Sequence, residues 1–139
     1  MTNNWIYDID NFILESTPFE IEISPDSNAF PAISLIHIRS GLRIVVCKTP
    51  GPLCQLNIFV PTITYSDKGL PHTLEHLIFC GSKNFPHRGY LDALANKCIS
   101  NGTNAYTAPD HTMYTFESAG EDGVINTLPV FLDGVFNPI

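Results

Sequence analysis

The chain has 139 residues, of which 44% are hydrophobic and 15% charged, a composition typical of one globular domain rather than a disordered segment. Seven basic residues stand against 14 acidic ones, and the net charge of −7 disfavours nucleic acid and anionic membranes as partners. No apolar run reaches the length of a transmembrane helix. The four cysteines form no Cys-x-x-Cys pair, which disfavours a cysteine zinc site. They lie inside apolar segments, which favours buried free thiols in a reducing compartment over disulfides.

Residues 1–32 are predicted to be irregular, with Pro18, Pro25 and Pro31 as breaks and a short strand in the alternating Phe19–Ile23 segment. Acidic residues precede the first basic residue, Arg39, and no signal-like apolar region occurs there. We therefore expect neither a secretory signal nor a transit peptide. A cytoplasmic protein is predicted, and a mitochondrial location is less favoured.

Three strands are predicted next. Ile33–Arg39 and Leu42–Lys48 are rich in β-branched residues, and Ser40-Gly41 between them predicts a hairpin turn. Cys54–Thr64 predicts a third strand that ends or bulges at Pro61, because proline cannot donate a hydrogen bond to a sheet.

Helices dominate the rest of the chain, interrupted by one hairpin. Helices are predicted at Leu70–Cys80 and Tyr90–Ile99, and a hairpin pairs Thr103–Thr107 with Thr112–Glu117. Ser118-x-x-Glu121 reads as a capping box that opens a third, apolar helix. These elements predict an α+β fold class, an antiparallel-rich sheet packed by helices, with residues 33–139 forming the domain.

The first helix carries a His-x-x-Glu-His motif. At about 100° per residue, His72, Glu75 and His76 fall on one side of the helix. Leu74, Leu77 and Ile78 fall on the other, which we expect to enter the core. Two histidines four residues apart can reach one tetrahedral Zn²⁺, and a carboxylate beside them can act as the base. The alternative is a buried helix with two ordinary histidines and a surface glutamate.

Several motifs in order resemble the M16 metallopeptidases, the pitrilysin-like, insulin-degrading and presequence-degrading enzymes. The segment Gly69-Leu-Pro-His-Thr-Leu-Glu-His-Leu-Ile-Phe-Cys-Gly-Ser82 is similar to the family signature, an inverzincin motif. Phe85-Pro86 and Asn104-Ala105-Tyr106-Thr107 follow in the family's order. Asp110-His-Thr-x-Tyr114 is most similar to the large eukaryotic branch near presequence protease.

The resemblance implies residue roles. His72 and His76 would be zinc ligands, with one Zn²⁺ per site, and Glu75 the general base. Asn104 and Ala105 would lie beside the active site, where the family adds an unfolded or extended peptide to the sheet as an extra strand. Without the family, this segment would be interpreted as a plain hairpin strand.

Two departures from the family pattern limit this interpretation. The family's third ligand is a glutamate on a later helix, and no acid of this chain lies in that segment. Asp110 or Glu117 can be proposed as substitutes, but each belongs more simply to the hairpin. The chain also resembles less than one M16 domain, so we expect an N-terminal part of the first domain whose partners include the missing downstream M16 domains. The remaining histidines are expected to be structural: His37, His87 and His111.

Three hypotheses follow from the sequence. The first is a zinc-dependent endopeptidase in which metal-activated water attacks the peptide bond with Glu75 as base. The second is a catalytically inactive M16-like fragment that binds peptides or partner domains. The third is a non-enzymatic α+β domain with a fortuitous motif. The 139-residue chain alone is expected to be nearly inactive, because it lacks the third ligand.

Overall fold

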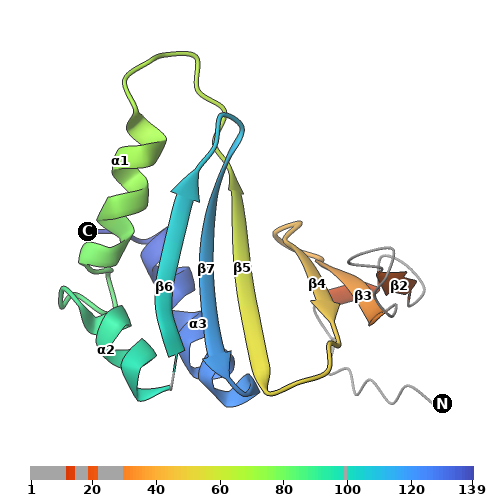
Figure 1. Cartoon of the computed structure of the whole chain (residues 1–139). Helices are drawn as coiled ribbons and strands as arrows, with labels where there is room; N and C mark the ends of the chain where they lie inside the picture. The colour runs from red at the N-terminus through yellow and green to blue at the C-terminus, as the bar shows by residue number, and fades with distance from the viewer. Residues whose placement is uncertain (1–11, 15–18, 22–29, 99) are drawn as a thin grey trace. The chain divides into compact units, whose positions relative to one another are not determined.

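The computed structural model describes residues 12–14, 19–21, 30–98 and 100–139. They belong to two compact units, residues 1–51 and residues 52–139 (Figure 1). The boundary predicted from the sequence lies after residue 32, and most of the segment predicted to be irregular lies outside the described residues.

The first unit is a small antiparallel sheet built around β3. Strand β3 pairs with each of the other three strands. The hairpin predicted at Ser40-Gly41 is confirmed, since the His37 N–H donates to the Leu42 carbonyl at 2.9 Å. The strands are β1 (Phe12–Leu14), β2 (Phe19–Ile21), β3 (Phe30–His37) and β4 (Arg43–Cys47).

The second unit holds a three-stranded antiparallel sheet in the order β5-β7-β6. Helix α3 lies across one face of this sheet, and α1 and α2 lie beside β6 (Figure 1). The predicted end of the third strand at Pro61 is confirmed. The elements are β5 (Leu53–Pro61), α1 (Leu70–Leu77), a 3-10 turn η1 (Ile78–Cys80), α2 (Tyr90–Lys97), β6 (Ser100–Thr107), β7 (His111–Ala119) and α3 (Glu121–Phe136).

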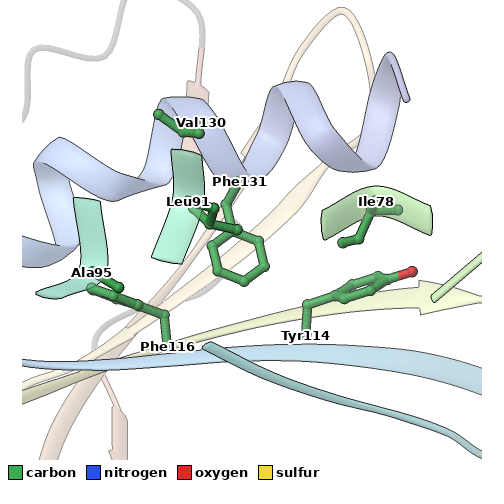
Figure 2. Close-up of a cluster of buried hydrophobic side chains, with 7 residues drawn as sticks. All are labelled: Ile78, Leu91, Ala95, Tyr114, Phe116, Val130 and Phe131. Carbon is green, nitrogen blue, oxygen red and sulfur yellow. The ribbon is translucent and has the colours of Figure 1, made fainter. Parts of the chain in front are cut away.

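Burial alternates along β7 and so distinguishes the two faces of this sheet. Thr112, Tyr114, Phe116 and Ser118 are buried, and the residues between them are less so. The buried face meets the helices in one apolar cluster, and burial of apolar area is its main stabilising contribution. Figure 2 shows this cluster, which comprises Ile78, Leu91, Ala95, Tyr114, Phe116, Val130 and Phe131.

The predicted capping box is wrong. Helix α3 has Gly120 as its N-cap and no side-chain cap, and the Ser118 hydroxyl instead donates to the Gly120 carbonyl at 2.9 Å. Ser118 is the last buried residue of β7, and its hydroxyl bonds a carbonyl at the helix start rather than an unpaired N–H of the first turn. A β-carbon on Gly123 would lie 2.0 Å from the Ser118 hydroxyl oxygen, which shows how closely α3 approaches the strand.

The predicted α+β class is confirmed. Both sheets are antiparallel, and in the second unit the helices pack on the sheet. The lengths of the predicted strands and helices change by a few residues, but every element predicted between residues 33 and 139 is present.

Candidate active site

Helix α1 carries the site and begins abruptly after a loop. Gly69 is its N-cap with φ of 64°, a left-handed conformation that glycine adopts without a steric cost. Pro71 stands in the first turn, where a missing N–H costs no helical hydrogen bond. The Thr73 hydroxyl donates to the Gly69 carbonyl at 3.1 Å and ties down the first turn.

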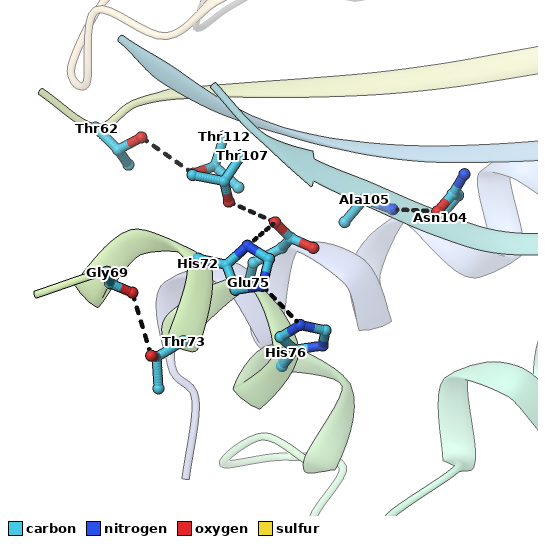
Figure 3. Close-up of polar contacts among 10 residues, drawn as sticks. All are labelled: Thr62, Gly69, His72, Thr73, Glu75, His76, Asn104, Ala105, Thr107 and Thr112. Atoms are coloured by element: carbon cyan, nitrogen blue, oxygen red, sulfur yellow. Dashed lines mark hydrogen bonds and ion pairs between the residues drawn. The ribbon is translucent and has the colours of Figure 1, made fainter. Parts of the chain in front are cut away.

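The two motif histidines converge on one point. Their Nε2 atoms are 3.2 Å apart, and both side chains are exposed (Figure 3). Two nitrogens bound to one tetrahedral Zn²⁺ at 2.0–2.1 Å would be about 3.3 Å apart. The His72–His76 spacing therefore matches the span of two ligands on one metal ion.

Glu75 is buried although it carries a carboxylate. Its exposed fraction is 6%, and its Oε2 accepts a hydrogen bond from the Thr107 hydroxyl at the end of β6 (Figure 3). The His72 Nδ1 lies 3.9 Å from the same oxygen. A buried carboxylate needs such polar partners because its desolvation is costly. The structure thus brings His72, Glu75 and His76 together on one side of α1, as predicted.

The expected apolar back of α1 is wrong in part. Leu74 and Leu77 are 42% and 46% exposed, and of the three predicted core residues only Ile78 is buried. The row that faces the sheet is Glu75 and Ile78, three residues apart on one face. The side of α1 that faces the sheet is therefore the Glu75 side, where the carboxylate accepts a hydrogen bond from Thr107 of β6. It is not the side of Leu74 and Leu77 that was expected.

Tyr114 lies in the core beneath this site. Burial raises the pKa of its phenol, and the negative charge of Glu75 raises that pKa further. The hydroxyl is therefore neutral throughout the physiological range.

Strand β6 has one sheet partner, β7, among the described strands. The Ala108 N–H donates to the His111 carbonyl at 2.8 Å, so in this register the N–H of Ala105 faces away from β7. That N–H donates instead to the Asn104 side-chain oxygen at 2.9 Å. The predicted peptide-binding residues thus lie on an open sheet edge, next to the strand end that contacts Glu75.

A threonine pair holds the loop between β5 and α1 to the sheet. The hydroxyls of Thr62 and Thr112 are 3.0 Å apart, and Thr112 is buried (Figure 3). The Thr62 N–H also donates to the Asp110 carbonyl at 3.1 Å. These bonds fix the chain on its way to the motif helix.

In the described part of the chain, no third ligand accompanies the two histidines. Among the residues that the structure describes, no group of three or more His, Cys, Asp or Glu side chains is arranged to hold a metal. Asp110 hydrogen-bonds His111 at 2.7 Å, which lowers the pKa of its carboxyl, and Glu117 accepts a hydrogen bond from Asn101 at 2.5 Å. Glu117 also lies on the face of β7 that points away from the helices. Neither proposed substitute serves the site.

The other histidines have local partners. His37 Nδ1 is 2.6 Å from the Ser40 hydroxyl in the first hairpin. His111 stacks edge-on against Tyr106, with its Nε2 3.3 Å from the tyrosine hydroxyl. The backbone carbonyl of His87 accepts a bond from the Tyr90 N–H at 3.1 Å, at the start of α2. The contacts of His37 and His111 involve their side chains, whereas that of His87 involves only its backbone, so a structural role for the His87 side chain stays a prediction.

The sequence places Thr107 in the hairpin and in the Asn104-Ala105-Tyr106-Thr107 motif, but it assigns no role to this residue. The signal that could have identified it is the alternation of β6: if Tyr106 points outward, Thr107 points toward the helices. Its partner Thr112 is likewise buried on that face. Period-two alternation along the strand therefore carries the information.

In the described part of the chain, no helix is long and apolar enough to cross a membrane. All four cysteines are free thiols, but they are half-buried rather than buried as their apolar segments predicted.

Comparisons with known proteins agree on one group. The family model described as insulinase, peptidase family M16, matches residues 64–139, more than half of the chain. An uncharacterized protein of Saccharomyces cerevisiae is 49% identical over 104 residues, 74% of this chain and 10% of its own length. A similar protein of Caenorhabditis elegans is 46% identical over 101 residues, 73% of this chain and 10% of its own.

Two further matches extend over more of the chain. The mitochondrial presequence protease of Danio rerio is 32% identical over 132 residues, 95% of this chain and 13% of that protein. The crystal structure of pitrilysin matches with a TM-score of 0.71 and 22% identity, covering 90% of this chain and 14% of that one. The pitrilysin match supports the fold. The chain spans about a tenth of the length of the curated relatives it matches.

Proposed function

Because this chain belongs to the insulinase family, peptidase family M16, we propose that its α1 site serves zinc-dependent hydrolysis of peptide bonds. The observation that carries the proposal is the pairing of His72 and His76 at 3.2 Å beside a buried glutamate. Family membership also removes the hypothesis of a fortuitous motif in an unrelated domain.

The histidine pair fits a zinc ion. Neutral imidazole nitrogen is a common zinc ligand, and the spacing of the two Nε2 atoms matches two tetrahedral positions. His72 and His76 would hold the ion, and when bound it would lower the pKa of a coordinated water to about 7. A catalytic zinc also needs a third protein ligand, which the described residues do not provide.

Glu75 suits the role of general base. Its Oε2 is held by Thr107, and Oε1 has no protein donor among the described residues, so one oxygen is available for a proton. A carboxylate in this position takes a proton from the attacking water and passes it to the leaving amine. Burial keeps bulk water from competing for that proton.

The open edge of β6 suits an extended peptide as substrate. A peptide strand paired there would bond to the backbone of Ala105, so recognition would depend little on side chains. Without a peptide, Asn104 Oδ1 accepts from the Ala105 N–H. A paired peptide carbonyl would replace that oxygen, and the amide NH₂ group would then be available to donate to a second peptide carbonyl. Unfolded and extended peptides are therefore the proposed substrate class.

A second candidate function is favoured by the missing third ligand. A chain with two histidines can bind peptides on β6, or pair with other M16 domains, without hydrolysing anything. The chain itself is then a binding module. The two candidates share the site and differ in whether a peptide bond breaks.

A reducing compartment is proposed for the protein. Free thiols at Cys47, Cys54, Cys80 and Cys98 agree with the cytoplasm predicted from the sequence. The presequence proteases among the relatives are named mitochondrial, and the mitochondrial matrix is reducing as well. Fractionation of cells that express the tagged protein decides between the two compartments.

The experiment compares zinc content, peptide binding and hydrolysis of the chain with those of Glu75→Gln. Glutamine keeps the shape and can still accept from Thr107 but cannot take a proton, so we expect bound zinc to persist and any hydrolysis to disappear. Hydrolysis by Glu75→Gln at the wild-type rate would contradict the mechanism. Peptide binding without hydrolysis by either protein would favour the second candidate.

A further inference from the structure

The Thr107 hydroxyl is held rigidly beside the motif helix. Thr107 pairs with Thr112 at the last position of the β6–β7 ladder, and the hairpin closes one residue later with the 2.8 Å bond from Ala108 to His111. Its hydroxyl donates to Glu75 Oε2 (Figure 3). A group on a closed hairpin is a more fixed anchor than one on a loop.

Glu75 needs such an anchor because, from its position on α1, it could act either as the base or as a metal ligand. Carboxylate oxygens are also zinc ligands, at about 2.0–2.2 Å, close to the distance for imidazole nitrogens. Glu75 stands between two histidines on the same side of one helix, and its Oε2 is 3.9 Å from His72 Nδ1. A carboxylate free to rotate there can become a ligand, and a carboxylate that coordinates the metal is no longer available as the base.

We propose that Thr107 is a positioning residue whose hydroxyl holds the Glu75 carboxylate against the end of β6, away from a metal bound by His72 and His76. The proposal rests on the proposed zinc function of this site. In this proposal, the hydroxyl of the last residue of β6 determines whether Glu75 acts as the base or as a metal ligand. One hydrogen bond then connects the strand that would bind the peptide to the carboxylate that would act on it.

The first test needs no metal. The ¹³C resonance of the Glu75 side-chain carboxylate is recorded by NMR in the full chain, in Thr107→Ser and in Thr107→Val. Serine keeps the hydroxyl and valine keeps the shape, so we expect the resonance to move in Thr107→Val and to stay near the wild-type position in Thr107→Ser. Amide spectra confirm that each variant folds, and Thr107→Ala replaces valine if that variant does not.

An unchanged resonance in the folded variants without the hydroxyl would overturn the proposal. Equal displacement in Thr107→Ser and Thr107→Val would also overturn it, since packing rather than the hydroxyl would then set the environment of Glu75.

The second test uses Co²⁺ as a spectroscopic substitute for zinc. Loss of one hydrogen bond to a charged group corresponds to roughly tenfold or more in an equilibrium constant. We therefore expect Thr107→Val to bind Co²⁺ about tenfold more tightly than wild type, with altered visible bands, because Glu75 joins the metal. The increase should vanish in Thr107→Val/Glu75→Gln and should not occur in Thr107→Ser.

The controls separate the two proposals. An increase that persists with Glu75→Gln, or no increase in Thr107→Val, overturns the role of Thr107 in keeping Glu75 from the metal. If the wild-type chain shows no Co²⁺ binding that is lost in His72→Ala, the proposed zinc function is overturned instead. The carboxylate resonance alone then decides whether Thr107 positions Glu75.

Discussion

Phe131 is the residue on which the packing of the second unit is predicted to depend most. It is 1% exposed, and its ring meets Phe79 at 6.2 Å and Tyr114 at 6.5 Å between centroids. Phe79 belongs to the turn η1 that ends the motif helix, and Tyr114 lies on the central strand β7 in the same core cluster. Phe131 therefore joins α3 to the end of the motif helix and to β7.

Truncation of Phe131 should cost much of the stability of the unit. Buried Phe→Ala changes cost about 3–5 kcal/mol, and aromatic pairs contribute about 0.5–1.5 kcal/mol beyond burial. With two such pairs, we expect Phe131→Ala to lose about 4–5 kcal/mol, a large part of a typical domain stability. Phe136, on the same helix but 63% exposed, is the matched control, and Phe136→Ala should change stability by less than about 0.5 kcal/mol.

Urea unfolding followed by circular dichroism measures both variants against wild type. If Phe131→Ala is unfolded without urea, Phe131→Leu supplies a smaller loss in the same direction. A loss below about 1.5 kcal/mol for Phe131→Ala, or equal losses for the two alanine variants, would refute this account of the core.

Three other predictions concern polar contacts and the backbone. Asp133 accepts four hydrogen bonds from Ser82, Asn84 and Asn137, and these bonds lower the pKa of its carboxyl. Its contribution to stability is therefore present above its unfolded-state pKa and is lost as the pH falls through its folded-state pKa. In an acid titration, Asp133→Asn should show a shallower loss of unfolding free energy than wild type. Gly81 has φ of 137°, and a β-carbon there would lie 2.9 Å from the Pro86 carbonyl oxygen, so Gly81→Ala should cost about 1–3 kcal/mol in urea unfolding. Asn104→Ala should weaken binding of an extended peptide about threefold to tenfold by fluorescence anisotropy, whereas Asn57→Ala on the outer face of β5 should not.

The sequence predicted local structure well where one physical rule dominated. The predicted helix start at Leu70 and the predicted strand end at Pro61 are both present, because proline constrains the backbone whatever surrounds it. The spacing of His72 and His76 on one helix follows from helical geometry alone. These predictions needed no knowledge of the tertiary contacts.

Rules that depend on tertiary contacts failed. Leu74 and Leu77 resemble core residues by pattern, yet the sheet meets the Glu75 side of α1. The Ser118-x-x-Glu121 pattern resembles a capping box, yet Ser118 is the last buried residue of β7. The partner of Glu75 lies on β6, distant in sequence, and the Ser118 side chain is fixed by its place in the buried face of β7. Periodicity within one segment carries no information about either constraint.

Zinc binding by the full chain tests the central claim most directly. A competitive titration with a chromophoric chelator should show one zinc site that His72→Ala or His76→Ala removes. Glu75→Gln should keep that site, because the carboxylate serves as base and not as ligand, and His87→Ala should keep it as the control histidine. Zinc that survives both His72→Ala and His76→Ala, or that is lost in Glu75→Gln, would contradict the account.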